Sequence, residues 1–406
     1  MAAQYTGFAL MTRRVLDGVT VLELGQIYNV PYCALLLAHL GAEVIKIEPP
    51  GGEPARHRAG GQDATPFVML NSGKRSVCLN LKTQQGRGLM LDLAAQADVV
   101  VENYRAGVLD RLGLTYEVLR QTNPRLIVAS GRGFSRRGPY KHLAAMDLTV
   151  QAMTGVMAAT GFADQPPVKA GPAIADFLGG VHLLSAILAA LLQREQTGHG
   201  QHVEVAMQDA MLPALASNLS ALLDSEGALP ERTGNRHGGL ALCPYNTYPA
   251  TDGWVAIFCA TDRHWLSLCD VLDRPDLKTD PALQTNPDRA RRMSEIDAVV
   301  SQWTAARRRV ECLATLGQAG IPAAPVKSLK EVLDDEQIAA SGMLRQVNHP
   351  RRGEMRVFGS PLHLADSPQP NLGAAPGLGE HTRAVLRERL ALSEAQLDQL
   401  DAQGAI

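Results

Sequence analysis

Hydrophobic residues in the first half of the chain follow two alternating patterns. Short runs of aliphatic residues, typical of buried strands, alternate with segments whose apolar residues recur every three or four positions, as on one face of a helix. Strands joined by helical crossovers form parallel sheets. The sequence therefore predicts an α/β domain with a doubly wound, Rossmann-like parallel sheet, which binds ligands where its strands end. The strands are predicted at 19–24, 43–48, 98–102 and 125–130, and the helices at 31–40, 85–96 and 116–121.

The pattern changes in the second half of the chain. A helix predicted at 209–223 is followed by a segment rich in Gly, Pro and Asn at 232–248 and by a strand at 254–258. We therefore expect a large α/β domain at 1–225, a smaller α+β domain at 226–330 and a C-terminal segment at 331–406. Further helices are predicted at 264–272, 287–302, 310–318, 329–336 and 381–403.

The composition is typical of a soluble globular protein. Hydrophobic residues make up 46% of the chain, and the net charge of −2 gives no overall attraction to nucleic acid or to a membrane surface. The six cysteines form no CxxC pair, and the eleven histidines show no metal-binding spacing. The N-terminus has no signal-peptide pattern, and the longest apolar run, 183–192, is too short to cross a bilayer. We therefore expect a cytoplasmic protein without a metal, which holds any anionic ligand with local Arg and Lys.

Asp176 lies where a loop is predicted to turn into a long apolar helix, just before the run 181–192. Free backbone N–H groups and the helix dipole are expected to keep a carboxylate ionised at such a position. An ionised, oriented carboxylate can attack an acyl carbon and carry the acyl group as an anhydride. The alternative is that Asp176 is only the N-cap of the helix, and this segment alone favours that alternative.

The common nucleotide-binding and hydrolase motifs are absent. The segment 131–136 follows a strand but lacks the third glycine of GxGxxG, and the chain has no GxxxxGK[ST] and no GxSxG. Basic segments do lie near predicted strand ends, at 71–76, 102–107 and 110–113. Each alone is typical of a solvated face, but together they can hold a phosphorylated ligand through charge-assisted hydrogen bonds.

Two loops are candidates for contact with a substrate. Gly238 and Gly239 follow His237, and paired glycines allow positive φ and a close approach of the backbone. Their N–H groups would stabilise an oxyanion over an active site; a plain turn between domains is the alternative. Arg56, near another strand end, is expected to pair with the second carboxylate of a short diacid, the alternative being a solvated basic loop.

Six stretches of the chain carry a resemblance to a known family. In order along nearly the whole sequence, they resemble the class III CoA-transferases, the CaiB/BaiF family, which includes formyl-CoA transferase and carnitine CoA-transferase. This collinearity is more specific than any single motif. The matching stretches are 40–48, 71–76, 98–104, 110–113, 197–201 and 378–382.

The resemblance implies roles for individual residues. The nucleophilic aspartate of the family falls on Asp176, and its mobile glycine loop falls near Gly238 and Gly239. CoA or acyl-CoA is a co-substrate in this family, and no cofactor is bound permanently. Family members are interlocked homodimers, and the predicted return of segment 331–406 to the large domain is compatible with that arrangement. The CoA-contacting positions fall on Tyr28, Asn29, Leu79, Asn80, Leu81, Lys82, Asn103, Tyr104, Arg105, Arg111, Leu143 and Met146.

The chain also departs from the family pattern. Formyl-CoA transferase has a glutamine at the position of Tyr28, and its basic residues near the positions of Pro49 and Ala144 are missing here. The phosphates of CoA must then be held by Lys82, Arg105, Arg111 or other nearby cations. Specificity for formate and oxalate is therefore not carried over.

A related class of enzyme, the α-methylacyl-CoA racemases, has the same fold and an aspartate at the position of Asp176. Racemisation needs a second acid/base group, which the racemases supply with a histidine just before an aspartate. The matching pair here is Met146 and Asp147, and a thioether cannot shuttle protons; His142 is four residues away.

We therefore expect a CoA-transferase, with a racemase-like enzyme as the alternative and a CoA-binding module without transfer activity as a third hypothesis. The expected reaction moves CoA from an acyl-CoA, for example succinyl-CoA, to a small dicarboxylic or hydroxy-dicarboxylic acid. It would proceed through an aspartyl anhydride and an aspartyl-CoA thioester.

Overall fold

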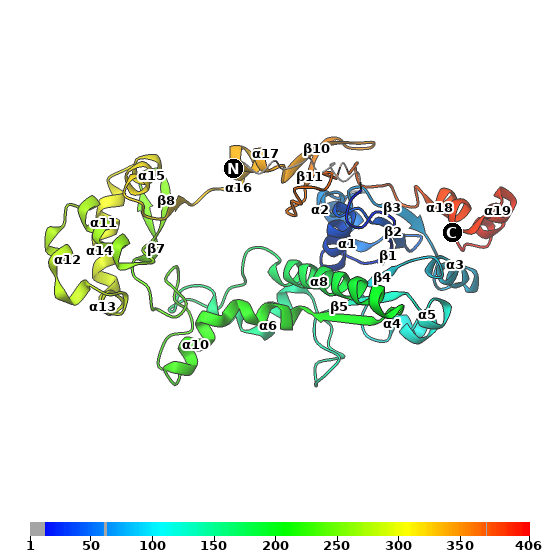
Figure 1. The fold of residues 1–406 in the computed structure, drawn as a ribbon, viewed down its shortest axis with the longest axis horizontal. Helices are drawn as coiled ribbons and strands as arrows, with labels where there is room; N and C mark the ends of the chain where they lie inside the picture. Colours follow the sequence, from blue (N-terminus) through cyan, green and yellow to red (C-terminus); the bar gives the residue numbers. More distant parts are fainter. Residues whose placement is uncertain (1–12, 61–62, 371) are drawn as a thin grey trace, which may run out of the picture. The chain divides into compact units, whose positions relative to one another are not determined.

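The computed structural model describes residues 13–60, 63–370 and 372–406, and it divides into two compact units (Figure 1). The first unit contains the described residues up to 150 together with 173–211 and 335–406, and the second contains 151–172 and 212–334. The C-terminal segment thus belongs to the first unit. The boundary predicted at residue 226 lies inside the second unit, whose second stretch of chain already begins at residue 212.

The first unit is built on a six-stranded sheet in the order β3-β2-β1-β4-β5-β6, in which all neighbours are parallel. This confirms the predicted doubly wound sheet. The strand order reverses on either side of β1, which pairs with both β2 and β4. Ligands of such sheets bind at this switch point. The strands are β1 (Thr20–Leu24), β2 (Glu43–Glu48), β3 (Arg75–Cys78), β4 (Val99–Glu102), β5 (Ile127–Arg132) and β6 (His202–Ala206).

Helices cover both faces of the sheet (Figure 1). On one face α1 (Asn29–His39) and α8 (Ile174–Thr197) pack against alternate aliphatic residues of β1, β4 and β5. On the other face α3 (Gln84–Ala94) and α5 (Tyr116–Thr122) pack together with α18 (Thr382–Leu390) and α19 (Glu394–Ala402) of the C-terminal segment.

Helix α8 is longer than the apolar run 183–192 suggested, and by length and composition alone it could cross a membrane. Its inner side chains, including Leu183 and Ile187, are buried against the sheet. Helix α8 is therefore packed as the core helix of this unit. The remaining elements of the unit are η1 (Pro54–Gly60), α2 (Thr65–Leu70), α4 (Val108–Leu112), α9 (Met207–Met211), α17 (Glu336–Ser341) and the antiparallel pair β10 (Leu344–His349) and β11 (Gly353–Phe358).

The second unit has its own antiparallel sheet and core. Strands β7 (Tyr245–Ala250), β8 (Gly253–Phe258) and β9 (Ala323–Pro325) form a three-stranded sheet. Trp265 and neighbouring apolar side chains are buried against it. The helical elements are α7 (Val156–Ala159), η2 (Leu212–Leu215), α10 (Ala216–Asp224), α11 (Asp262–Val271), α12 (Pro275–Thr279), η3 (Pro281–Leu283), α13 (Asn286–Ala290), α14 (Met293–Ala305), α15 (Arg309–Gln318) and α16 (Leu329–Leu333). Helix α6 (Asp147–Thr154) crosses from the first unit into the second.

Four predicted helices are interrupted in the structure. The predicted helix 209–223 is divided into α9, η2 and α10, because Pro213 cannot continue a regular helix. The predicted final helix 381–403 ends at Ala391, whose φ is 54°, and Ser393 caps a new helix. Segments 287–302 and 329–336 are also divided, into α13 with α14 and into α16 with the start of α17.

Candidate active site

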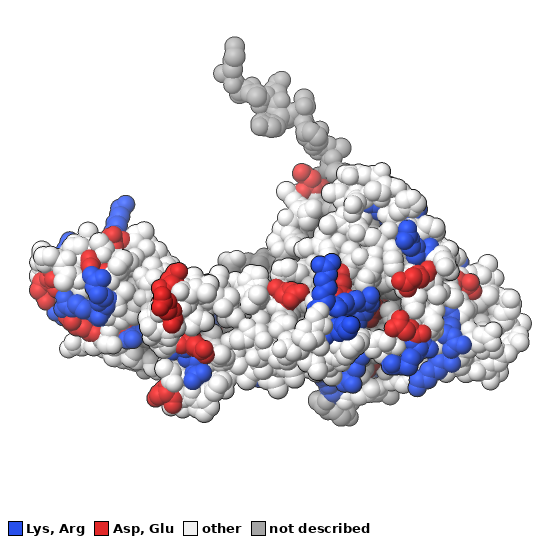
Figure 2. All heavy atoms as spheres, turned by 90° about the horizontal axis from the view of Figure 1, so that it is seen from below, with Lys and Arg blue, Asp and Glu red and all other residues white. Residues whose placement is uncertain are grey.

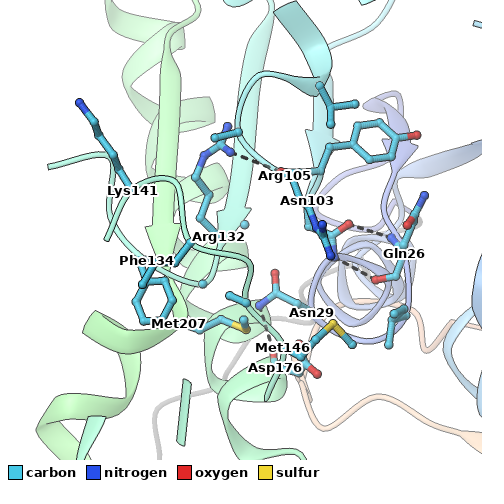
Figure 3. A pocket seen from close by; sticks show the side chains of 18 residues that line it. Gln26, Asn29, Asn103, Arg105, Arg132, Phe134, Lys141, Met146, Asp176 and Met207 are labelled. Carbon is cyan, nitrogen blue, oxygen red and sulfur yellow. Dashed lines mark hydrogen bonds between the residues drawn. The ribbon is translucent and has the colours of Figure 1, made fainter. Parts of the chain in front are cut away.

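The loops that follow β1, β4, β5 and β6 enclose a cavity of about 380 Å³ in the first unit (Figure 3). The cavity lies at the carboxyl ends of the strands, next to the switch point between β1 and β4, as the sequence predicted. Asp176 lines it, and no other residue of the described lining is acidic. The cavity therefore brings the predicted nucleophile to the predicted edge of the sheet.

Asp176 is the third residue of α8, and it does not cap the helix. The N-cap residue, Ala173, has no side chain that can do so. Asp147, at the start of α6, takes that role instead. Its Oδ1 accepts hydrogen bonds from the backbone N–H of Ala175 at 2.8 Å and of Asp176 at 3.3 Å. The N-cap interpretation of Asp176 is therefore wrong, and its carboxyl group remains available for other chemistry.

Burial, together with the nearby charge of Asp147, raises the pKa of Asp176 to about 7, and the charge of Arg58 opposes this rise. The expectation that the helix N-terminus keeps this carboxyl ionised is therefore corrected: desolvation and a like charge outweigh the dipole. At neutral pH the group is divided between its acid form and its carboxylate. A desolvated carboxylate is a stronger nucleophile than a fully hydrated one, because less water must be removed before it attacks.

Asn29 fixes the first turn of α8 against α1. Its Nδ2 donates to the carbonyl oxygen of Asp176 at 3.1 Å (Figure 3). The side chain lies between Gly131 and Gly179. A Cβ at Gly131 would come within 2.2 Å of Asn29 Oδ1, and one at Gly179 within 2.3 Å of Asn29 Nδ2. Glycine at these two positions therefore makes room for the amide that holds Asp176 in place.

A second amide joins two loops of the cavity wall. Asn103, after β4, accepts from the backbone N–H of Gln26 and donates to its carbonyl oxygen, both at 2.9 Å. The loop after β1 is thereby tied to the loop after β4 (Figure 3). Arg132 donates to the carbonyl oxygen of Tyr104 and pairs with Glu102, which supports the same loop from β5.

Comparison with known proteins identifies the family. The sequence model of CoA-transferase family III matches residues 16–382. The formyl-CoA:oxalate CoA-transferase of Streptomyces coelicolor is 36% identical over 98% of this chain and 100% of its own. The acetyl-CoA:oxalate CoA-transferase of Acetobacter aceti is 38% identical over 94% of this chain and 97% of its own. The crystal structure of a CaiB/BaiF family protein from Brucella suis superposes with a TM-score of 0.81 at 36% identity, covering 93% of this chain and 99% of that one.

The chain belongs to CoA-transferase family III. It is a CoA-transferase of the CaiB/BaiF family, and its co-substrates are CoA thioesters. The family resemblance seen in the sequence is confirmed. In residues 13–60, 63–370 and 372–406, no group of three or more His, Cys, Asp and Glu is arranged to hold a metal ion.

The structure gathers part of the predicted CoA-transferase site in the cavity. The predicted residues that line it are Asn29, Asn103, Tyr104, Arg105, Leu143, Met146 and Asp176. Both polar ends of the Asn103 amide are already hydrogen-bonded to Gln26, so its side chain has a structural role in addition to any contact with CoA. The lining also contains residues that the sequence analysis missed, among them Gln26, Ile27, Arg132, Lys141 and Met207. Position alone could have found most of them, because each of Gln26, Ile27, Arg132 and Met207 lies at or just after the end of a strand.

The other predicted CoA contacts lie outside this cavity lining, at Tyr28, Leu79, Asn80, Leu81, Lys82 and Arg111. The side chain of Leu79 is buried in the core, so it can offer a ligand only its backbone. Asn80 is occupied by the C-terminus: its backbone and side-chain N–H groups donate to Ala405 and Gly404. Lys82 and Arg111 are exposed. The roles of these residues toward CoA remain predictions.

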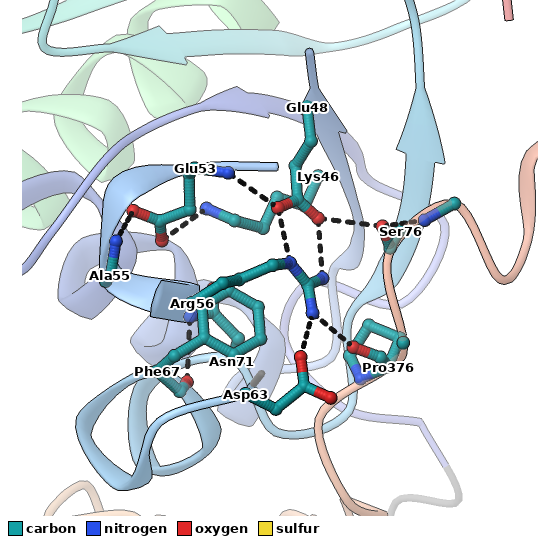
Figure 4. Close-up of polar contacts among 12 residues, drawn as sticks. Lys46, Glu48, Glu53, Ala55, Arg56, Asp63, Phe67, Asn71, Ser76 and Pro376 are labelled. Atoms are coloured by element: carbon teal, nitrogen blue, oxygen red, sulfur yellow. Dashed lines mark hydrogen bonds and ion pairs between the residues drawn. The ribbon is translucent and has the colours of Figure 1, made fainter. Parts of the chain in front are cut away.

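Arg56 cannot bind a substrate carboxylate as predicted, because it is only 2% exposed and its guanidinium is fully engaged (Figure 4). Its Nε and Nη2 donate to the two carboxylate oxygens of Glu48, each at 2.7 Å. Its Nη1 contacts the carboxylate of Asp63 and donates to the carbonyl oxygen of Pro376 at 3.1 Å. Arg56 therefore anchors η1, Asp63 and the C-terminal segment to β2.

Gly238 and Gly239 belong to the second unit. Neither has a positive φ; that conformation is taken by Leu240, with φ 48°. A Cβ at Gly238 would lie 2.8 Å from the side chain of Asn218, so a larger residue there would have to displace the Asn218 amide on α10. The N–H of Gly239 donates to Nδ1 of His237 at 3.2 Å. The predicted oxyanion role would need that hydrogen bond to open, and the role remains a prediction.

The pKa of Asp176 predicts how the rate depends on pH. The nucleophile must be ionised, so kcat/KM for CoA transfer should rise with pH through about 7 and fall on the acid side. Asp147→Asn keeps an oxygen that can accept from Ala175 and Asp176 but removes the like charge. It should shift the midpoint of the pH profile to lower pH. A midpoint that stays unchanged or moves to higher pH, measured from pH–rate profiles of both proteins, would contradict this electrostatic coupling.

Proposed function

We propose that the protein transfers CoA from an acyl-CoA donor to a small carboxylic acid, with Asp176 as the covalent intermediate carrier. The observation that carries the proposal is the position of Asp176: a buried carboxyl, held at the first turn of α8, in the cavity at the switch point. The match of nearly the whole chain to a CoA-transferase family supports the same reaction class.

The transfer takes four displacement steps. An Asp176 oxygen attacks the thioester carbonyl, the C–S bond breaks with its electrons going to sulfur, and a mixed anhydride forms. The CoA thiolate then attacks Cγ of Asp176 and expels the donor acid as its carboxylate, which leaves an aspartyl-CoA thioester. The acceptor carboxylate attacks the same Cγ and releases the thiolate, which finally attacks the acceptor acyl carbon and regenerates Asp176. Because each step exchanges one anion for another, no net proton is taken up or released.

The cations around the cavity support the binding of an anionic CoA thioester. Arg105 and Lys141 line the cavity and are exposed, and Arg111 lies on the short helix α4 that follows Arg105. Figure 2 shows Lys and Arg gathered on the surface of the first unit. Exposed cations that can move toward phosphates suit such a ligand. We therefore assign the phosphates of CoA to Arg105, Arg111 and Lys141, with Lys82 as a further contact.

We infer a dicarboxylic acid as the acceptor class. Two relatives that match nearly the whole chain are named for oxalate, which is a dicarboxylate. Oxalate, succinate and malate should therefore be tested first, with formyl-CoA, acetyl-CoA and succinyl-CoA as donors. The proposal expects a new acyl-CoA only when both a donor and an acceptor acid are present, read by chromatography of the CoA species. If no donor and acid pair gives one, while the folded protein still binds CoA, the protein is a CoA-binding module instead.

The racemase alternative needs a second acid/base group opposite Asp176. The described lining of the cavity contains no histidine, and Met146 occupies the position in question. His142 is exposed and is not part of that lining. Incorporation of deuterium from solvent at the α-carbon of a 2-methylacyl-CoA, in the absence of any acid, would favour the racemase.

A homodimer is part of the proposal. Large apolar side chains are exposed on helices of both units, such as Leu192 of α8 at 68% and Leu223 of α10 at 76%. Exposed apolar residues that form a contiguous patch mark an interaction surface, and the members of the family that this chain resembles are dimers. A monomeric mass in sedimentation equilibrium at micromolar concentration would contradict it. Cytoplasmic localisation stays a prediction.

A further inference from the structure

Arg58 is a half-buried arginine that no carboxylate neutralises. It lies on η1, two residues after the anchored Arg56. Its Nη1 donates to the hydroxyl of Tyr28 at 2.9 Å, and its guanidinium carbon lies 5.0 Å from the centre of the Tyr28 ring. Among the described residues, no Asp or Glu forms a salt bridge with it. Within the described part of the chain, this positive charge is therefore held against Tyr28 without an ion pair.

An aromatic bridge connects this charge to the nucleophile. Tyr28 stacks on Phe177 with ring centres 6.0 Å apart, and Tyr32 meets the same ring edge-on at 4.9 Å. Phe177 directly follows Asp176 in α8, and Tyr28 directly precedes the cavity residue Asn29. The charge of Arg58 acts on the Asp176 carboxyl, since it opposes the rise of its pKa. Arg58 therefore lies near Asp176, on the side of Tyr28 and Phe177, and outside the described lining of the cavity.

The support beneath Arg58 is rigid. Arg56 is fixed by Glu48 and Asp63, and Glu53 accepts from the backbone N–H of Ile27 at 2.9 Å. Lys46, buried beside Glu53, donates to the carbonyl oxygen of Gly25 at 2.8 Å (Figure 4). One network of buried charges thus holds both η1, which carries Arg58, and the β1–α1 loop, which carries Tyr28. Such support keeps a recognition group in a defined geometry.

The reaction itself changes what Arg58 faces. Once Asp176 has become a thioester, the negative charge on which Arg58 acts is gone. A substrate that carries a second carboxylate would restore the charge balance. The guanidinium can grip it with two parallel N–H groups. Tyr28 accepts from Arg58 through its hydroxyl oxygen and still has its own proton to donate to the same carboxylate.

We propose that Arg58, together with Tyr28, binds the second carboxylate of the acid substrate, so that the enzyme selects dicarboxylic over monocarboxylic acids. This inference rests on the proposed CoA-transfer function and gives it a specificity-determining residue. It also transfers to Arg58 the role that the sequence analysis gave to Arg56.

The test compares two acids of equal length, succinate and butyrate, with acetyl-CoA as the donor. Arg58→Met should raise KM for succinate by about 10- to 100-fold, as expected for the loss of a charge-assisted pair, and change KM for butyrate by less than about threefold. Arg58→Lys keeps the charge without the fork and should give a smaller loss, again for succinate alone. Tyr28→Phe should raise KM for succinate by about threefold to tenfold. Arg291→Met, an exposed arginine of the second unit, is the matched control and should behave as wild type.

The outcomes distinguish a failure of the Arg58 assignment from a failure of the proposed CoA-transfer function. If wild-type protein transfers CoA to neither acid nor to the other acids of the panel, the proposed function fails and this inference fails with it. If wild-type protein is active and Arg58→Met affects both acids equally, or neither, only the assignment of Arg58 is overturned. A thermal melt of each variant shows whether it is folded, and Arg58→Lys carries the test if the methionine variant is not.

Discussion

Asp176→Asn should lose CoA transfer by about 10⁴-fold or more in kcat, the scale seen when a covalent nucleophile is removed. The amide nitrogen and oxygen of asparagine are poor nucleophiles, and no other acidic residue lies in the described lining of the cavity. The backbone of the first turn should be preserved, because its contacts with Asn29 and Asp147 involve backbone atoms of residue 176. CoA binding should therefore survive while transfer does not. The measurement is the initial rate of acyl-CoA exchange, with Asp92→Asn on the exposed side of α3 as the matched control.

The same substitution should make the protein more stable at neutral and higher pH. The folded-state pKa of Asp176 is raised to about 7, above its ordinary value of 3.8. The folded state therefore holds the proton more tightly than the unfolded state, and the free energy of unfolding falls as pH rises from about 4 to about 7. Asparagine cannot ionise, so it avoids that loss. The expected gain at pH 8 is on the order of 2–4 kcal/mol and should vanish below about pH 4. The measurement is denaturant unfolding of both proteins at pH 8 and below about pH 4. Equal stability of the two proteins at pH 8 would contradict the description of Asp176 as a buried carboxyl without an ion-pair partner among the described residues.

Arg56→Met should destabilise the protein by about 3–5 kcal/mol, the usual cost of removing one partner from a buried ion pair. Glu48 and Asp63, each 1% exposed, would be left without the cation that both now contact. The C-terminal segment would also lose the hydrogen bond from Arg56 to Pro376. The measurement is the denaturant midpoint. The midpoint of Arg56→Lys should lie between those of wild type and Arg56→Met, because lysine keeps the charge but loses the paired contact with Glu48.

The matched control for Arg56 is the same change two residues further along the chain. Arg58 is half-buried and pairs with no described carboxylate, so Arg58→Met should cost less than about 1 kcal/mol. The two methionine variants should therefore differ from wild type in different properties. Arg56→Met should lose stability, and Arg58→Met should change the choice of acid. Equal destabilisation of both variants would show that the charge network in Figure 4 does not anchor η1 as described.

The sheet could be predicted from the sequence because its strands are short, continuous aliphatic runs. Val99, Val100 and Val101 illustrate this, being buried on both sides of the central strand β4. The position of Asp176 followed from the resemblance and from the start of a long apolar helix. The edge strand β6 was missed, since its residues are half-buried and show no continuous run of this kind.

The contacts that tune the site could not be predicted, because they join residues far apart in the sequence. The cap from Asp147 reaches α8 across 28 residues, and nothing in the local pattern around Asp147 indicates it. The choice between Arg56 and Arg58 depends on which of them faces Glu48 and Asp63, and the sequence of the short 3₁₀ helix η1 leaves that undetermined. The division of the chain was equally hidden, because the second unit takes 151–172 from the middle of the first.

The central claim, that Asp176 carries the acyl group and then CoA, is tested most directly by trapping the intermediate. Wild-type protein incubated with an acyl-CoA and then treated with hydroxylamine should carry a hydroxamate on Asp176, found by peptide mass spectrometry, and Asp176→Asn should carry none. A hydroxamate confined to another residue, or CoA transfer that continues without any modified peptide, would contradict the account.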